Sequence, residues 1–443
     1  MQIYLWFFGK KGWFYLHKSE KCSTFAEKFG KKTMVLNYIW ISLILLAVLM
    51  GIVQAVFFGQ TDIFTELLNS TFANAKTGFE LALGLTGVLT FWTGVMKIGE
   101  QGGVINTLSR GVAPFFSRIF PEVPKGHKVF GSMLMNVSAN VLGLDNAATP
   151  MGLKAMAELQ EINPDKKRAS NAMIMFIVLG ASGLTIVPTS IMAYRAQLGA
   201  ANPADVFLPI LIATYVSTLV GLLACCAIQK INILDKVVLG TIVGLTALMG
   251  GLVVGASMLE QEQLTTLSAG FAAIFLLAII TWFIIQAASQ KVNVYEAFID
   301  GAKDGFKTAV SLIPFMVAIL VAVGMFRTSG AMDLLEHGLA WVFEKCGINP
   351  SMAGAVPTAL MKPLSGGGAR GLMIEAMTNY GADSLVGRLC CILQGTTDTT
   401  FYVLAVYFGS VDIKETRHAV ACCLLSDFAG MITAFIIAPI FFG

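Results

Sequence analysis

The chain has 443 residues, of which 56% are hydrophobic and only 13% are charged. A soluble domain carries about 25% charged residues, so this composition excludes a water-exposed globular surface and predicts a protein embedded in a membrane. The net charge of +3 is small, and the basic residues are dispersed between apolar segments rather than gathered on one face, so we expect no nucleic-acid partner.

Residues 1–33 mix aromatic side chains with lysines. They lack a continuous apolar run and a small-residue cleavage site, which argues against a cleavable signal peptide. We expect a basic, aromatic segment that lies at the cytoplasmic surface of the membrane. The alternative is an upstream extension of little consequence, with Met34 as a second start.

Apolar segments of about 20 residues, the length that crosses the hydrocarbon core of a bilayer, follow along the whole chain. They cover residues 37–58, 78–96, 169–194, 206–228, 237–258, 267–288, 308–326, 389–411 and 419–442, and the second and seventh are marginal in length. These segments predict an all-α integral membrane protein with about nine transmembrane helices.

Two further apolar stretches, residues 129–156 and 353–377, carry glycine, proline and polar residues at their centres. Freed backbone groups find no water in hydrocarbon, so such a segment is tolerated only inside protein or beside an aqueous cavity. Each stretch is either a re-entrant helical hairpin or a kinked spanning helix. Two re-entrant hairpins leave most of the 30 Lys and Arg residues in cytoplasmic loops, as the positive-inside rule prefers. We therefore predict two hairpins, a cytoplasmic N-terminus and an external C-terminus.

The chain also contains an internal repeat, since residues 75–79 (AKTGF) recur as residues 302–306 (AKDGF). Each copy begins a short apolar helix, followed by an amphipathic interfacial stretch, a broken hairpin, a helix with polar residues at its centre and a plain helix. An odd number of predicted spans separates the two hairpins, which inverts the second half. Inverted repeats with discontinuous helices are a recurring transporter plan, whereas a duplication kept only for packing is the alternative.

This organisation divides the chain into five parts. After the N-terminal segment we expect a leading transmembrane helix over residues 34–74 and a first repeat over 75–230. Two linking helices over 231–301 and a second repeat over 302–443 complete the chain.

Asp145 and Asp398 are the sharpest functional candidates. A carboxylate near the middle of a membrane costs on the order of 2.5–3.5 kcal/mol, so it normally faces a cavity or a partner. Either acid could carry a coupling proton or help to bind a coupling cation such as Na⁺. The alternative for Asp398 is a structural ion pair with Lys362 or Arg370.

Other polar residues gather in the two broken segments and the two helices with polar centres. Taken singly, Ser and Thr in membrane helices more often bond to their own backbone, so the clustering in corresponding elements carries the prediction. The predicted solute-binding residues are Asn136, Ser138, Asn140, Asp145, Asn146, Thr149, Ser182, Thr185, Lys362, Ser365, Arg370, Gln394, Thr396, Thr397, Asp398 and Thr400. The basic residues of the second hairpin indicate an anionic group on the solute. No Cys or His spacing suits a metal, and we expect no cofactor.

Long motifs in these elements resemble the spore maturation protein A and B family, whose members carry the nucleoside recognition, or Gate, domain. Residues 136–150 (NVSANVLGLDNAATP) resemble the A-protein signature, while residues 362–366 (KPLSG) and 394–409 (QGTTDTTFYVLAVYFG) resemble the B-protein signature. The similarity covers roughly residues 34–443 and indicates an A–B fusion. It implies two re-entrant hairpins and a solute pathway without specifying the substrate. The chain departs from the B pattern at Lys362, where the family has arginine, and at Arg370, where it has an apolar residue.

These features favour a secondary transporter in the cytoplasmic membrane of a bacterium, with a small polar or anionic solute, nucleoside-like or carboxylate-like, and Na⁺ or H⁺ as coupling ion. Its expected partners are that solute and the lipid bilayer, and self-association into a homo-oligomer is left open. No nucleotide-binding motif or nucleophile–base pair is present, so we expect neither a primary pump nor an enzyme. The alternative function is a non-transporting membrane receptor or assembly factor that binds a small ligand or lipid.

Overall fold

A computed structural model describes residues 33–124, 126–141, 145–183, 185, 188–259 and 261–443. The predicted N-terminal surface segment therefore lies outside the described residues apart from its last residue. In the described part the chain forms helices joined by short loops, with an isolated β-bridge between Arg168 and Glu415. This agrees with the predicted all-α fold.

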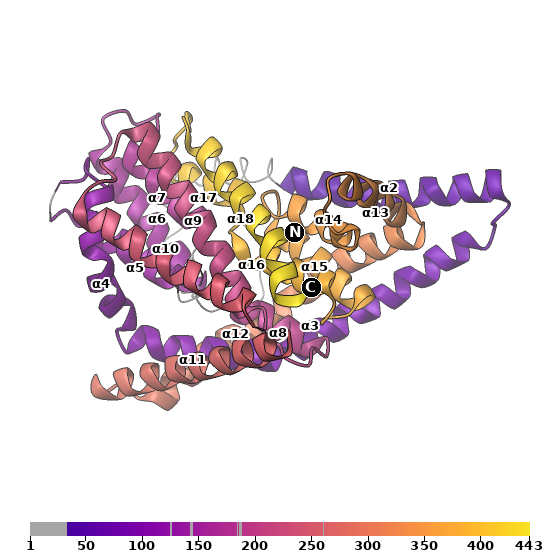
Figure 1. Ribbon diagram of the computed structural model, residues 1–443, viewed down its shortest axis with the longest axis horizontal. Helices are drawn as coiled ribbons and strands as arrows, with labels where there is room; N and C mark the ends of the chain where they lie inside the picture. Colours follow the sequence, from indigo (N-terminus) through magenta and orange to yellow (C-terminus); the bar gives the residue numbers. More distant parts are fainter. Residues whose placement is uncertain (1–32, 125, 142–144, 184, 186–187, 260) are drawn as a thin grey trace, which may run out of the picture.

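The helices follow one another as Figure 1 labels them. In chain order they are α2 (Thr33–Phe58), α3 (Ile63–Gln101), α4 (Val104–Ile119), α5 (Val129–Val141), α6 (Asp145–Ile162), α7 (Asn171–Ser182), α8 (Thr189–Gln197), α9 (Phe207–Gln229), α10 (Lys236–Ser257), α11 (Gln261–Ser289), α12 (Val294–Thr328), α13 (Ala331–Lys345), the 3-10 helix η3 (Pro350–Ala355), α14 (Val356–Met361), α15 (Gly366–Tyr380), α16 (Leu385–Thr396), α17 (Thr400–Ser410) and α18 (Ala419–Phe442).

In the described part of the chain, 8 helical segments are long and apolar enough to cross a membrane, and they correspond to eight of the predicted spans. The protein is thus an all-α, multi-pass membrane protein. The remaining predicted span, residues 169–194, is divided into α7 and α8. Gly183 ends α7 in a left-handed conformation (φ 54°), and Pro188 precedes α8. The number of actual crossings stays a prediction.

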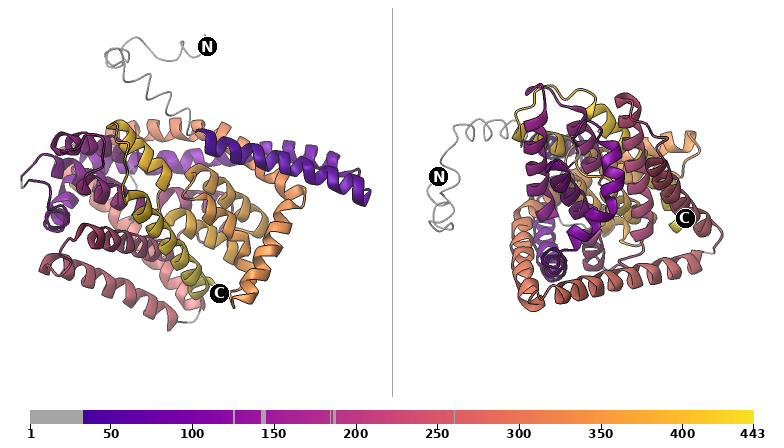
Figure 2. Two further views of the ribbon diagram at one scale, coloured as in Figure 1. Left: turned by 90° about the horizontal axis from the view of Figure 1, so that it is seen from above. Right: turned by 90° about the vertical axis from the view of Figure 1, so that its left-hand side faces the viewer.

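One short helix was expected at the start of each repeat, but each is part of a longer helix. The first lies in α3, which has 39 residues, and the second lies in α12, which has 35. The repeat boundaries proposed at residues 75 and 302 consequently fall inside these helices. Figures 1 and 2 show α3 and α12 as long rods that run beside each other through the molecule.

Contacts between these rods follow a two-fold pattern. A Cβ atom on Gly78 of α3 would lie 3.0 Å from the Cα atom of Val317, and a Cβ atom on Gly305 of α12 would lie 2.8 Å from the carbonyl oxygen of Leu89. Gly78 and Gly305 hold the same position in the repeated motif. Each glycine thus admits the backbone of the other half, and the helices are antiparallel.

The final helices of the two halves, α9 and α18, are also antiparallel. Phe207 at the start of α9 shares a buried cluster with Phe441 at the end of α18, whereas Cys225 shares another cluster with Cys422. Between these ends the hydroxyl groups of Ser217 and Ser426 are 2.8 Å apart. Equivalent helices that pack in opposite directions support the predicted inverted repeat.

The two broken segments form pairs of helices, α5 with α6 and α14 with α15. Asn136 of α5 donates its side-chain amide to the carbonyl oxygen of Ala148 in α6, at 2.7 Å. In the second pair, the Ser365 hydroxyl accepts from Gly368 N–H and caps α15. That each pair enters and leaves on one face of the membrane stays a prediction.

The linking helices α10 and α11 lie at the outside of the bundle (Figure 2). Large apolar side chains such as Leu248, Ile274 and Leu277 are exposed on them. Lipid is the solvent that such a face requires.

Candidate functional site

The breaks in α7–α8 and α16–α17, one from each half, meet inside the molecule. The backbone N–H of Asp398 donates to the carbonyl oxygen of Ala181 at 2.8 Å. A Cβ atom at Gly183 would lie 3.2 Å from the nitrogen of Asp398, so glycine allows this approach. The Asp398 carboxylate accepts from the N–H of Thr399 at 2.6 Å, which supports the extended backbone between α16 and α17.

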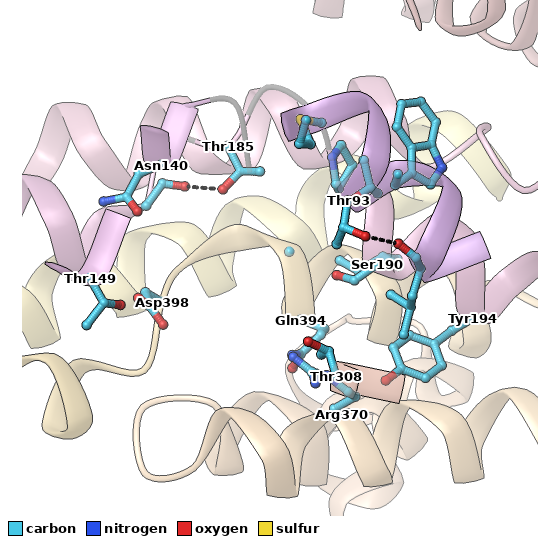
Figure 3. A pocket seen from close by; sticks show the side chains of 18 of the residues that line it. Thr93, Asn140, Thr149, Thr185, Ser190, Tyr194, Thr308, Arg370, Gln394 and Asp398 are labelled. Carbon is cyan, nitrogen blue, oxygen red and sulfur yellow. Dashed lines mark hydrogen bonds between the residues drawn. The ribbon is translucent and has the colours of Figure 1, made fainter. Parts of the chain in front are cut away.

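A cavity of about 670 Å³ lies beside these breaks. Its wall comes from α3 and α5–α8 of the first half and from α12, the α14–α15 turn and α15–α17 of the second half. Figure 3 shows Thr149 and Asp398 at one end of the cavity, with Tyr194, Arg370 and Gln394 grouped at another. Both halves of the repeat therefore contribute to one polar site.

Half of the predicted solute-binding residues line this cavity. They are Asn140, Thr149, Thr185, Lys362, Arg370, Gln394, Thr397 and Asp398. Asn140, Thr149 and Thr185 come from the first half and the others from the second, so residues far apart in sequence are brought together as the repeat predicts.

Other predicted residues hold the elements in place behind the wall. Asn136 joins α5 to α6 and also donates to the hydroxyl of Tyr407 at 3.3 Å. The Ser138 hydroxyl lies 3.2 Å from the hydroxyl of Ser109. Ser182 and Thr396 donate to carbonyl groups of their own helices, and Ser365 is a helix cap.

Three predicted residues remain. Thr400 is fully buried, and its hydroxyl has no hydrogen-bond partner within the described part of the chain. Helix α6 begins at Asp145, but the side chains of Asp145 and Asn146 lie outside the described residues. The coupling role of Asp145 thus stays a prediction.

Arg370 and the aromatic rings give the cavity its chemical character. The guanidinium carbon of Arg370 lies 5.8 Å from the centroid of the Tyr194 ring, a cation–π contact between the two halves. Tyr402, Tyr407 and Trp92 also line the wall. A planar ring can stack on such faces while its anionic or electron-rich groups meet the cation.

Asp398 and Lys362 supply opposite charges to the same cavity. Asp398 is exposed toward it, whereas Lys362 is 6% exposed and follows α14 at its C-cap. Asp398, Lys362 and Arg370 thus lie along one cavity wall, and the structural ion pair considered from the sequence stays the alternative to a coupling role of Asp398.

The glycines at the start of α15 serve close packing. A Cβ atom on Gly366 would lie 2.4 Å from the hydroxyl oxygen of Thr399, and one on Gly367 would lie 2.4 Å from the Phe315 ring. This explains the glycine run without a phosphate-binding loop.

Sequence reasoning missed two groups of residues. Helices α3 and α12 line the cavity with Thr93, Lys97 and Asp304 among others, although they were expected only as apolar spans. The second group is Asp427, a buried acid in α18, which is 1% exposed. A single carboxylate in an otherwise apolar segment was a signal that could have identified it.

An ion network outside the spans joins the two halves. Arg195 is fully buried and contacts Asp205 at 2.8 Å and Asp383 at 2.9 Å, while Arg388 contacts Asp205 at 2.9 Å. Burial raises the pKa of Asp205, and the charges of Arg195 and Arg388 act to lower it. The corresponding loops of the inverted repeat are joined by the exposed pair Arg168–Glu415, at 3.6 Å, by a hydrogen bond from the Arg417 guanidinium to the carbonyl oxygen of Ala169 at 3.0 Å, and by backbone bonds.

Comparisons with known proteins agree with this architecture. A family model described as "Gate: Nucleoside recognition" matches residues 82–199 and 309–414, which contain most of the cavity-lining residues of both halves. The chain is 42% identical to Spore maturation protein B of Bacillus subtilis (strain 168) over 165 residues, 37% of this chain and 91% of that protein. It is 37% identical to Spore maturation protein A of the same strain over 183 residues, 41% of this chain and 90% of that protein. The two matches agree with a fused A–B form. No solved structure matches the chain significantly.

Proposed function

Because the chain belongs to the Gate (nucleoside recognition) family, we propose that it is a secondary transporter whose central cavity binds a small polar or anionic solute. The solute is nucleoside-like or carboxylate-like. Transport rather than catalysis is proposed for this site.

The observation that carries the proposal is the meeting of the two helix breaks at the cavity wall. The contact between Asp398 N–H and the Ala181 carbonyl joins equivalent discontinuous helices from the two inverted halves. Transporters built from inverted repeats bind their solutes where such helices meet, because movement of one half against the other then exposes the site to alternate sides.

The cavity wall supports the solute class. Lys362 and Arg370 provide positive charge, and Tyr194 and Tyr402 provide aromatic faces. Asn140 and Gln394 add amide donors and acceptors. A small anion with a planar or hydroxylated body would use all three kinds of group.

Coupling to Na⁺ or H⁺ is proposed at the same breaks. Asp398 is the acid that the sequence predicted for the second half, and its carboxylate faces the cavity. We place the protein in the cytoplasmic membrane of a bacterium with its N-terminus inside, because this orientation keeps most basic residues in cytoplasmic loops.

Reconstitution into proteoliposomes tests the proposal. Labelled nucleosides and small carboxylates are offered under an imposed Na⁺ or proton gradient, and empty liposomes are the control. The proposal predicts accumulation of one solute class that stops when the gradient is dissipated. Saturable binding without uptake would contradict transport and support the receptor alternative.

A further inference from the structure

Asp427 is a buried acid that does not itself line the cavity. It lies in the middle of α18, where the neighbouring residues are apolar or small, and it is 1% exposed. Neither of its carboxylate oxygens has a hydrogen-bond partner within the described residues. A buried carboxylate in this condition is costly, and a bound cation or proton would lower that cost.

Two hydroxyl groups from the α16–α17 break face this carboxylate. They belong to Thr397, which is 6% exposed, and to Thr400, which is fully buried. The Thr400 hydroxyl also has no hydrogen-bond partner among the described residues. In addition, the last turn of α16 ends at Thr396, where backbone carbonyl groups lose their helical donors.

The packing of α18 fixes this arrangement. Gly430, one turn beyond Asp427, lies so close to Thr396 that a Cβ atom there would be 2.3 Å from the threonine methyl group. Ser426, the residue before Asp427, donates its hydroxyl group to the carbonyl oxygen of Ser217 at 2.8 Å. Asp427 is therefore held against the break from a helix that does not itself line the cavity.

We propose that Asp427, together with the hydroxyl groups of Thr397 and Thr400, binds a sodium ion. Carboxylate and hydroxyl oxygens are hard ligands suited to a small, hard cation. A bound proton is the competing occupant, because the hydroxyl oxygens of Thr397 and Thr400 that face the carboxylate can also accept the O–H of a protonated carboxyl group, and the dependence of stability on Na⁺ separates the two.

This site would couple directly to the cavity. Thr397 lines the cavity and also faces Asp427, while the charge of Lys362, another lining residue, acts on the same carboxylate. An anion bound beside Lys362 offsets the positive charge that otherwise opposes a cation at Asp427. The anionic solute and sodium therefore bind with positive cooperativity. This coupling rests on the proposed transport function, whereas sodium binding itself does not.

Sodium binding is measured on the purified full-length protein without any solute. The unfolding midpoint is followed by tryptophan fluorescence while NaCl replaces choline chloride at constant ionic strength. The midpoint should rise with Na⁺ and saturate. Asp427→Asn should abolish the rise, and Asp300→Asn, a change of an exposed acid on α12, should leave it intact.

A second pair of variants keeps the test decisive if Asp427→Asn fails to fold. Thr400→Val removes the hydroxyl with little change in shape and should weaken the apparent Na⁺ affinity about tenfold, whereas Thr400→Ser should retain it. An Na⁺-independent midpoint in the wild type would overturn the proposal, as would equal affinities for the two Thr400 variants. A midpoint that depends on pH but not on Na⁺ would assign the carboxylate to a proton instead.

A loss of the sodium effect in Asp398→Asn but not in Asp427→Asn would move the site into the cavity and also overturn the proposal. Because no solute or uptake is involved, failure of these measurements is distinguishable from failure of the transport function.

Discussion

Arg370 of the second half lies over the ring of Tyr194 from the first half, with its guanidinium carbon 5.8 Å from the ring centroid. Both side chains belong to the cavity wall. A cation held against an aromatic face is preoriented for a planar anion, and the contact crosses the boundary between two halves that must move relative to each other in a transporter.

We expect Arg370→Met to weaken solute binding by about tenfold or more, because a hydrogen bond to a charged group contributes roughly 1.5–3 kcal/mol. Arg370→Lys should restore only part of the affinity, since lysine lacks the planar guanidinium. Equilibrium binding to the detergent-purified protein measures both. Arg110→Met on the exposed side of α4 is the matched control, and equal losses for Arg370→Met and this control would contradict a role in the cavity.

Asp398→Asn should abolish gradient-driven uptake while the protein remains folded and inserted. The change keeps the size and hydrogen-bonding capacity of the side chain but removes its charge. A coupling acid does not need to neutralise Lys362 or Arg370, so the coupling role predicts little change in the unfolding midpoint. Uptake and thermal unfolding are measured on the same preparation.

The double variants Asp398→Asn with Lys362→Met or Arg370→Met serve as the control for this prediction. If the acid only neutralised a neighbouring cation, removing both charges would restore stability and full gradient-dependent uptake. Such a recovery would rule out coupling through Asp398.

The ion network around Arg195 should be essential for stability. Arg195→Met leaves Asp205 buried with one cation fewer, which we expect to cost roughly 3–5 kcal/mol. Arg168→Met at the corresponding exposed pair should cost at most about 1 kcal/mol. Chemical denaturation of the two variants gives the comparison, and similar losses would show that burial of the network contributes nothing.

The same network predicts a pH dependence. Burial already raises the pKa of Asp205, and loss of Arg195 removes a charge that opposes this shift. A carboxyl group whose pKa is higher in the folded state than in the unfolded state lowers the free energy of unfolding. This loss grows as the pH rises from the unfolded-state pKa to the folded-state pKa. The destabilisation by Arg195→Met should therefore be greater at about pH 8 than at about pH 5. A pH-independent loss would contradict this prediction, because it would show that removal of Arg195 does not raise the pKa of Asp205 further.

Topology can be tested with single cysteines in a background without the native ones. The predicted orientation places the residue 201–202 loop and the residue 349–351 segment outside, and Cys346 nearby is exposed. Membrane-impermeant thiol reagents added to whole cells should label cysteines at Ala201 and Ser351 but not at Asp165. Labelling of Ala201 or Ser351 only after cell lysis would place these segments in the cytoplasm and contradict the orientation.

Much of this architecture could be predicted from the sequence, because a bilayer constrains the length and polarity of each spanning segment. Both properties can be recognised within a single stretch of sequence. The apolar segments located eight helical spans, and the repeat AKTGF/AKDGF located equivalent positions in α3 and α12. Polar residues at the centres of residues 129–156 and 353–377 correctly indicated that these segments are broken, whereas the predicted continuous span over residues 389–411 is divided into α16 and α17.

The remaining features depend on tertiary contacts. Hydropathy suggested that residues 169–194 form one span, although Gly183 and Pro188 mark the break that the structure contains. It could not separate Asn140, which faces the cavity, from Asn136 one turn away, which holds α5 to α6. It also gave no reason to connect Asp427 with Thr400, because their proximity results from the packing of α18 against the break.

Solute counterflow tests the central claim most directly. Proteoliposomes are loaded with unlabelled solute and diluted into buffer that contains a trace of labelled solute, without an ion gradient. A carrier with one alternately exposed site predicts a transient accumulation of label above equilibrium, which is weakened in Arg370→Met and preserved in Arg110→Met. Binding of label without any accumulation inside the liposomes would contradict the account, because it would show a site that is never exposed to the other side.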